Sequence, residues 1–119
     1  MDLYRHASLV NYALLAKKAV AAARDVFSLV SSDRQRLIGA PSASVMAIRL
    51  LEQLPTHPVV TIPRVVKILE TTKPTAGKAV QLLERTGILV ETSGKRRDRT
   101  FAYKAYLERL RSGTELEEG

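Results

Sequence analysis

Apolar residues recur at three- and four-residue intervals in the first third of the chain, which is the spacing of one face of a helix. We therefore expect a long helix from Leu9 to Val30. Six alanines within it favour helix and leave room for a second helix to approach closely, and the simplest expectation is that the apolar face packs against its own domain. That face consists of Leu9, Tyr12, Ala13, Ala16, Val20, Ala23, Phe27 and Val30.

A polar run interrupts this pattern at Ser31-Ser32-Asp33. Ser32 and Gln35 have the spacing of a capping box, in which the two residues satisfy free backbone N–H groups at the start of a helix. The run therefore predicts that the long helix breaks and that a short second helix follows, ending at Gly39. The segment Ala40-Pro41-Ser42 then separates this helical part from the rest of the chain.

The segment after this joint predicts a helix and a brief strand. Ser42 or Ser44 can cap the helix, and Pro55 stops it. The β-branched run from Val59 to Ile62 is too short for a helix and predicts a strand. The apolar face of the helix consists of Ala47, Leu50, Leu51 and Leu54.

Two amphipathic helices joined by a tight turn come next. The first is expected at about Ile62–Glu70 with Thr61 as its cap, and the second begins after a turn in which Thr72 is the cap. Gly87 ends the second helix. The residues expected to face inward are Ile62, Val65, Val66 and Leu69 on the first helix and Ala76, Val80 and Leu83 on the second.

The remaining pattern predicts an antiparallel hairpin and a closing helix. Residues Ile88–Val90 and Thr100–Tyr103 are strand-like, and a turn at Ser93-Gly94 followed by a charged loop lies between them. A last helix is expected from about Lys104 to Arg111. The fold class is thus mainly α with a small β-hairpin (α+β), a winged helix-turn-helix preceded by a long N-terminal helix and a short helix. We expect a helical extension (residues 1–40), a winged helix-turn-helix domain (41–111) and a flexible acidic tail (112–119).

Composition indicates an acidic partner. The chain has 119 residues, with 19 Lys and Arg against 12 Asp and Glu, for a formal charge of +7. Between Thr75 and Lys104 there are seven basic and three acidic residues, so the excess is concentrated on the predicted winged helix. Such a distribution is typical of proteins that bind nucleic acid.

Other classes of protein are disfavoured by what the sequence lacks. It has no cysteine, its two histidines have no metal-ligand spacing, and no apolar run reaches the length of a membrane span. The N-terminus has no signal-peptide pattern, so we expect a cytoplasmic protein without cofactor or metal and without a membrane partner. No nucleophile with a spaced His and acid, no paired carboxylates and no phosphate-cradling loop can be assembled, so we expect no catalytic residues.

The second helix of the pair has the features of a recognition helix. A helix that enters the major groove needs side chains with hydrogen-bonding groups on one face and little bulk around them. In the sequence, Gln81 could hydrogen-bond adenine, and Lys78 could bind guanine or a phosphate. Gly77 has no side chain and would let the helix backbone approach the DNA. The alternative is an ordinary solvated helix face. The candidate residues on this helix are Lys73, Thr75, Gly77, Lys78, Gln81 and Arg85.

The loop between the predicted strands carries four cations that core packing cannot explain. Their mutual repulsion in a short loop favours a counter-charge supplied by phosphate, although a solvated, flexible hairpin tip is the alternative. The four candidates are Lys95, Arg96, Arg97 and Arg99. Phe101, Tyr103 and Tyr106 have the spacing of core or hairpin packing, and we do not count them as stacking residues.

Residues 43–107 resemble the winged helix-turn-helix at the C-terminus of many bacterial Fic-family proteins. The likeness lies in Pro58-Val-Val-Thr-Ile62, Pro74-Thr-Ala76, Leu83-Glu-Arg-Thr-Gly-Ile-Leu89 and Gly94-Lys-Arg-Arg-Asp-Arg-Thr-Phe-Ala-Tyr103. The alanine-rich helix is similar to the last helices before that domain. Glu70 stands where the family's turn often has Gly, and Thr71 where it often has an aliphatic residue.

The resemblance implies a parent that transfers AMP from ATP to a hydroxyl through a His-Pro-Phe-x-x-Gly-Asn-Gly-Arg loop. This sequence lacks that loop, since His57-Pro58 shares only the first two residues. The resemblance therefore implies the accessory part of such a protein, either a fragment or the product of a split gene, with a Fic catalytic domain as a partner.

Two functions follow from these patterns. The first is binding of double-stranded DNA, sequence-specific or general, in a regulatory or targeting role in the bacterial cytoplasm, with transcription regulation as the expected context. The second is a protein-interaction module in which the winged helix binds a partner and the N-terminal helix pairs with a second copy through Ala13, Ala16, Val20 and Ala23.

Overall fold

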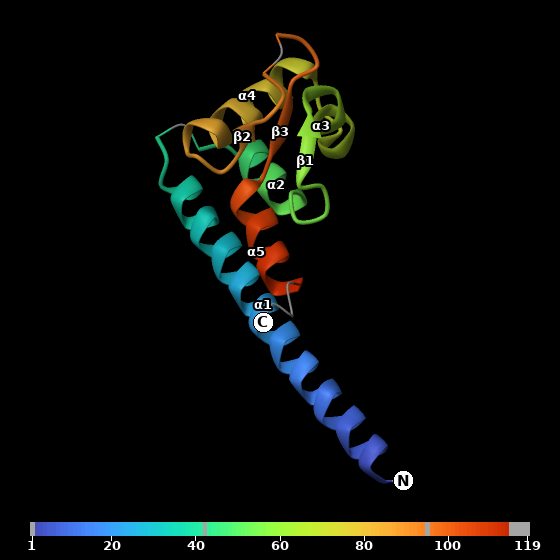
Figure 1. The fold of residues 1–119 in the computed structure, drawn as a ribbon. Helices are drawn as coiled ribbons and strands as arrows, with labels where there is room; N and C mark the ends of the chain where they lie inside the picture. Colours follow the sequence, from blue (N-terminus) through green and yellow to red (C-terminus); the bar gives the residue numbers. More distant parts are fainter. Residues whose placement is uncertain (1, 42, 95, 115–119) are drawn as a thin grey trace.

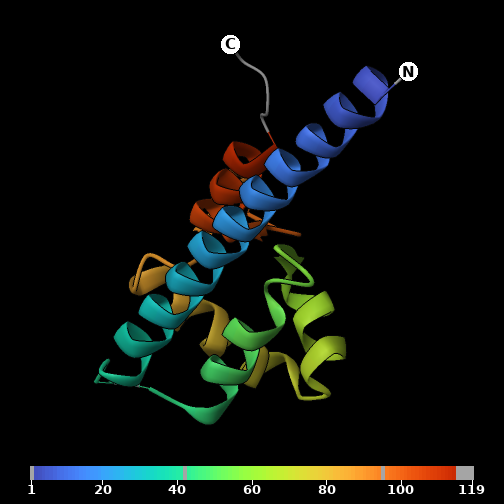
Figure 2. The same ribbon diagram turned by 90° about the horizontal axis from the view of Figure 1, so that it is seen from below.

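The long N-terminal helix dominates the shape of the molecule. The computed structural model describes the backbone of residues 2–41, 43–94 and 96–114, and side chains from residue 10 to residue 113 within these ranges. Helix α1 (Asp2–Ile38) runs along one side of the domain, and its N-terminal half projects beyond it, so that the molecule measures 64 × 30 × 26 Å (Figure 1). Helix α5 (Lys104–Thr114) lies beside its middle part (Figure 2).

The predicted break in the N-terminal helix is wrong, because α1 is continuous through Ser31-Ser32-Asp33. The polar side chain of Asp33 is not a terminus signal: it is buried and accepts a hydrogen bond of 2.7 Å from the Tyr103 hydroxyl. Arg36 lies 3.8 Å from the other carboxylate oxygen of Asp33. Tertiary contacts thus replace the predicted capping box. The predicted end is confirmed, since the helix stops at Ile38 and the Gly39 N–H donates to the Gln35 carbonyl at 3.1 Å.

The apolar face predicted to pack against the domain is mostly exposed. Ala13, Ala16, Val20 and Ala23 are exposed, and Phe27 has 73% of its surface accessible. Of the described residues of that face, only Val30 packs against the core, and the domain otherwise packs on neighbouring positions of α1. Leu37 is fully buried there, and Val26 and Leu29 pack against the core. Arg109 of α5 also reaches this side, donating to the Asp25 carboxylate at 3.0 Å.

Hydroxyl caps start the three helices of the winged helix at the predicted places. Ser44 caps α2 (Val45–Gln53), Thr61 caps α3 (Ile62–Leu69) and Thr72 caps α4 (Lys73–Arg85). Each side chain accepts a hydrogen bond from the backbone N–H three residues later, which satisfies one of the free donors of the first turn. Proline in the first turn of α3 and of α4 removes another free donor.

The turn between α3 and α4 needs one residue in a left-handed conformation. Glu70 takes it, with φ 52°, and the Thr71 N–H then bonds the Val66 carbonyl at 3.1 Å. Gly87 plays the same part after α4, with φ 81° and a 2.9 Å bond from Ile88 to Leu83. Both turns are therefore Schellman motifs. The tight predicted turn forms even though a residue with a Cβ occupies the position that glycine favours.

A three-stranded antiparallel sheet completes the domain, in the order β1 (Val59–Thr61), β3 (Thr100–Ala102), β2 (Val90–Glu91). Val59 and Val90 both pair with Ala102, on its two sides. The predicted hairpin is confirmed, but its first strand begins only at Val90. Ile88 and Leu89 are buried, and their N–H groups both donate to the Leu83 carbonyl, so they belong to the end of the helix. The fold is mainly helical with a small sheet, as predicted.

The aromatic residues near the C-terminus belong to the core, as predicted. Tyr103 is fully buried and stacks on Tyr106, with ring centroids 5.4 Å apart and an interplanar angle of 15°. The Tyr106 hydroxyl donates to the Pro55 carbonyl at 3.0 Å. Burial raises the pKa of the Tyr103 hydroxyl well above its ordinary value, and the hydrogen bond to Asp33 raises it further.

Helix α5 extends to Thr114, past the predicted end at Arg111, and residues 115–119 of the predicted acidic tail lie outside the described part of the chain. Leu37 of α1 shares the core with residues of α2 and α4. The division into a separate extension and domain stays a prediction. Among the described residues, no helix is both long enough and apolar enough to cross a membrane.

Replacement of Tyr103 by Phe should lower the free energy of unfolding by about 1–3 kcal/mol, because it leaves the buried Asp33 carboxylate without its donor. The matched control is Tyr106→Phe, which removes a hydroxyl bonded to a neutral carbonyl and should cost about 0.5–1.5 kcal/mol. Because the pKa of Tyr103 is raised in the folded chain, its contribution is present in full below about pH 10 and is lost as the pH rises further. Urea unfolding of the variants at pH 7 and pH 11 measures both effects, and equal losses for the two tyrosines would contradict the assignment.

Candidate nucleic-acid interface

Helix α4 separates an apolar inner face from a polar outer face. The inner face is buried in the core and consists of Ala76, Ala79, Val80, Leu82 and Leu83. Of the predicted site residues, Lys73, Lys78, Gln81 and Arg85 are exposed on the other side, and Thr75 and Gly77 are half-buried. The separation confirms the predicted orientation of the helix.

Gly77 and Thr75 have different local roles. A Cβ added at Gly77 would meet no atom within 4 Å, so packing does not require glycine there. A glycine within a helix costs about 0.5–1 kcal/mol relative to alanine, and what it provides here is a low, open surface. Thr75 takes part in the start of the helix: its N–H donates to the Thr72 hydroxyl oxygen at 3.4 Å, and the two hydroxyl oxygens are 3.0 Å apart.

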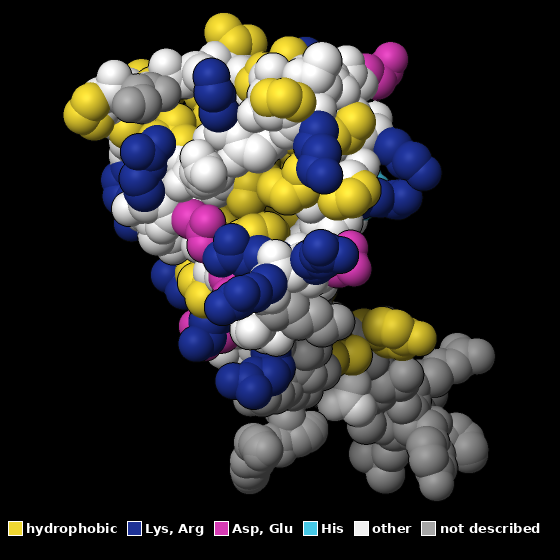
Figure 3. All heavy atoms as spheres, turned by 90° about the horizontal axis from the view of Figure 1, so that it is seen from above, with side chains coloured by type: hydrophobic (Ala, Val, Ile, Leu, Met, Phe, Trp, Pro, Cys, Tyr) yellow, Lys and Arg dark blue, Asp and Glu magenta, His cyan; other side chains and the backbone are white. Residues whose placement is uncertain are grey.

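The first turn of α4 and the cationic loop line a common groove. We call β2, β3 and the loop between them the wing. The groove has a volume of about 380 Å³ and contains four cations against one carboxylate. Figure 3 shows Lys and Arg side chains spread over the face that carries α4 and the wing tip. The lining residues are Ile62, Pro63, Lys73, Arg96, Arg97, Asp98 and Arg99.

A second groove lies on another side of α4, between that helix and the start of α2. It has a volume of about 530 Å³, and its lining from α4 includes Thr75, Lys78, Gln81 and Arg85. The lining from α2 was not predicted: Ser44, Val45 and Met46 contribute through the packing of α2 on α4, which no local pattern reveals. The predicted residues of α4 are thus divided between the two grooves: Lys73 lines the first, and Thr75, Lys78, Gln81 and Arg85 line the second.

The cations of the wing are held in different ways. Within the described part of the chain, Arg96 and Arg97 are exposed and make no ion pair or hydrogen bond. Arg99 lies 4.0 Å from the Glu91 carboxylate, and its guanidinium carbon lies 5.7 Å from the centre of the Phe101 ring. The predicted site residue Lys95 lies outside the described residues.

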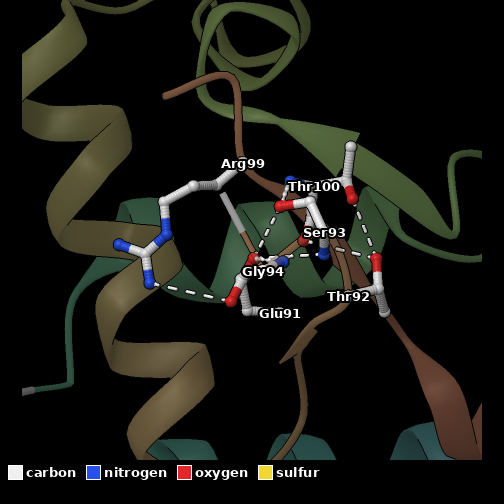
Figure 4. Close-up of polar contacts among 6 residues, drawn as sticks. All are labelled: Glu91, Thr92, Ser93, Gly94, Arg99 and Thr100. Carbon is white, nitrogen blue, oxygen red and sulfur yellow. Dashed lines mark hydrogen bonds and ion pairs between the residues drawn. The ribbon is translucent and has the colours of Figure 1, made fainter. Parts of the chain in front are cut away.

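A carboxylate that the sequence analysis did not single out organises the base of the wing (Figure 4). One oxygen of Glu91 accepts hydrogen bonds from the Ser93 hydroxyl at 2.6 Å, the Gly94 N–H at 2.7 Å and the Ser93 N–H at 3.1 Å. The Ser93 hydroxyl oxygen in turn accepts from the Thr100 N–H at 3.2 Å. The hydroxyl of Ser93 and the amide of Gly94 lower the pKa of Glu91, since they favour its charged form.

The far end of α4 is joined to α1. Arg36 donates a hydrogen bond to the Thr86 carbonyl, one of the free acceptors at the C-terminus of the helix. The same Arg36 pairs with Asp33, which receives the Tyr103 hydroxyl. The end of α4 is thus held by a contact from α1.

The arrangement suits an extended anion. Among the residues that the structure describes, no group of three or more histidine, aspartate or glutamate side chains could hold a metal ion. The surface instead offers exposed cations and the amide side chain of Gln81, which provide charge neutralisation and hydrogen-bonding groups, and Gly77 adds no side chain that would keep a ligand away.

Comparisons with known proteins give a limited result. No protein-family model matches the chain, and no curated protein matches it. Among solved structures, the chain is similar to the crystal structure of a MarR-family transcription regulator, with a TM-score of 0.48 and 17% sequence identity over 94% of this chain and 74% of that one.

Proposed function

We propose that this chain binds double-stranded DNA, with the outer face of α4 in the major groove and the wing on the adjacent sugar-phosphate backbone. The observation that carries this proposal is the groove in which Lys73, at the start of α4, meets Arg96, Arg97 and Arg99 of the wing. A recognition helix and a cationic loop on one side of a molecule can contact one duplex together.

The individual residues have distinct roles in this proposal. Gln81 and Lys78 lie where base edges would be reached, and amide and ammonium groups suit adenine and guanine. Gly77 allows the helix backbone to approach. Lys73, Arg85, Arg96 and Arg97 neutralise phosphate. An RNA duplex is a poorer ligand, because its major groove is too deep and narrow to accept a helix.

The motifs shared with the Fic family favour a regulatory or targeting role for such a domain. In that role the chain performs no chemistry itself, and it directs either a separate AMP-transferring core or its own assembly to DNA in the bacterial cytoplasm. Regulation of transcription is the simplest outcome of such binding.

A second proposed function, pairing with another copy of the chain, is favoured by the exposed stripe on α1. Its members Ala13, Ala16, Val20, Ala23 and Phe27 alternate in steps of three and four residues, which is the spacing of a coiled-coil seam. All five are exposed, so the domain itself does not cover them. The alanines would allow a second α1 to approach closely.

Arg96→Ala and Arg97→Ala should each weaken binding to every duplex and reduce the slope of log affinity against log salt by about 0.9, the effect of one lost phosphate contact. The control is Arg24→Ala, which removes an exposed cation from α1, away from both grooves, and should leave the slope unchanged. Fluorescence anisotropy with mixed genomic duplex at several salt concentrations measures this. Unchanged slopes in both wing variants would count against phosphate contact.

Lys78→Ala and Gln81→Ala should instead change which sequences are preferred. Loss of a good base contact removes about 1–3 kcal/mol of discrimination at one position of the site. Selection from a random duplex pool, followed by sequencing, compares the preferred sites of each variant with those of the unaltered chain. Uniform weakening across all sequences would reassign these residues to backbone contacts.

Val20→Glu together with Phe27→Glu should convert a dimer of the chain to monomer, since both changes place a charge in the seam. Ser28→Glu is the matched control, because Ser28 is exposed on α1 outside the stripe and should not affect assembly. Sedimentation velocity over a range of concentrations provides the readout. An unaltered chain that is monomeric at all concentrations removes the pairing proposal and leaves DNA binding untouched.

A further inference from the structure

A negative charge inside a cationic loop is unfavourable for binding a polyanion. The Glu91 carboxylate nevertheless lies within the wing, with only 20% of its side chain exposed. Three of its hydrogen bonds converge on a single oxygen and come from the two residues that begin the turn, Ser93 and Gly94. Gly94 is in a left-handed conformation there, with φ 67°. The carboxylate therefore fixes the direction in which the chain leaves β2.

The same carboxylate restrains one of the loop cations. Its other oxygen lies 4.0 Å from Arg99, and Phe101 lies under the guanidinium of Arg99. One residue beyond Glu91, the two sides of the hairpin are joined by a 2.9 Å bond from the Thr92 N–H to the Thr100 carbonyl. The base of the wing is thus closed by backbone and side-chain bonds, while Arg96 and Arg97, on the far side of the loop, stay unpaired in the described part of the chain.

We infer that Glu91 is a positioning residue for DNA binding: it sets the path of the wing and tethers Arg99, so that Arg96 and Arg97 are presented to the phosphates. This inference rests on the proposed function above. It divides the loop cations into two kinds. Arg96 and Arg97 neutralise phosphate, whereas the charge of Arg99 is largely matched by Glu91 and serves the shape of the loop.

The direction in which DNA affinity changes when Glu91 is replaced distinguishes a positioning role from an effect of its charge alone. Charge alone predicts that removing Glu91 strengthens DNA binding. A positioning role predicts the opposite, since the loop loses its shape. Asp98 provides the matched control: it lies in the same loop and lines the groove, but within the described residues it makes no ion pair or hydrogen bond. Its φ of 54° is one that asparagine tolerates well.

The experiment measures duplex affinity and salt slope for Glu91→Ala, Glu91→Gln and Asp98→Asn beside the unaltered chain. We expect Glu91→Ala to lower affinity about three- to tenfold and to reduce the slope by about 0.9, as if one phosphate contact were lost. Glu91→Gln should lower the affinity and the salt slope in the same direction but by less, and it serves as the second variant if the alanine variant folds poorly. Asp98→Asn should raise affinity.

An independent readout follows the wing without DNA. In ¹H–¹⁵N spectra, the amide signals of Ser93 and Gly94 should shift together as Glu91 is protonated, at a pH below the ordinary pKa of a glutamate, and the shift should vanish in Glu91→Gln.

The outcomes distinguish the two proposals. If the unaltered chain binds duplex and both Glu91 variants bind as tightly or more tightly, the positioning role is wrong and the DNA-binding function stands. If the unaltered chain shows no salt-dependent binding to duplex, the function itself fails, and the role assigned to Glu91 fails with it.

Discussion

The hydrogen bond from Tyr103 to Asp33 is the contact on which the arrangement of the molecule depends. It joins α1 to the point where β3 becomes α5, between residues far apart in the sequence, and both partners are buried. A buried carboxylate without a partner is costly, so this pair specifies how α1 lies on the domain as well as stabilising it. Arg36 extends the connection from Asp33 to the end of α4. The position of the proposed DNA-contacting helix is therefore tied to the long N-terminal helix.

Three carboxylates of this basic protein, Asp25, Asp33 and Glu91, connect separate parts of its structure. Asp33 receives a buried hydroxyl, and Glu91 gathers the donors of the wing turn. Asp25 and Arg109 connect α1 to α5 in the same way at the surface. Within the described part of the chain, none of these acids pairs with Arg96 or Arg97, which are exposed on the wing.

Local chemistry predicted most of the winged helix. Thr61 and Thr72 identified two helix starts, and Ser44 is the one of the two candidates Ser42 and Ser44 that caps α2, because a hydroxyl cap acts within three residues of itself. The outer face of α4 followed from periodicity, and Gly87 marked the helix end. The correct turn at Glu70 needed no glycine, because the surrounding Schellman bonds hold it.

The errors and omissions concern contacts between distant residues. The Ser31-Ser32-Asp33 run has the local preference of a break, and burial of Asp33 against Tyr103 overrides it. The choice of which α1 face packs inward depends on α5, which lies at the other end of the sequence. The role of Glu91 could not be predicted from the sequence, because it depends on β2 ending beside the turn. The α2 residues of the second groove could not be predicted either, because they depend on the packing of α2 on α4.

The length of α1 has a geometric consequence. The winged helix lies at one end of a 64 Å molecule, and the stripe on α1 extends toward the other. Two copies with their α1 helices parallel would hold their two winged helices side by side. Both could then bind successive turns of one double helix, which are about 34–36 Å apart. With the α1 helices antiparallel, the two winged helices would point away from each other and could only bridge separate stretches of DNA. Whether two α1 helices pair in parallel or antiparallel would thus decide whether a dimer binds two neighbouring sites on one duplex or bridges separate stretches of DNA.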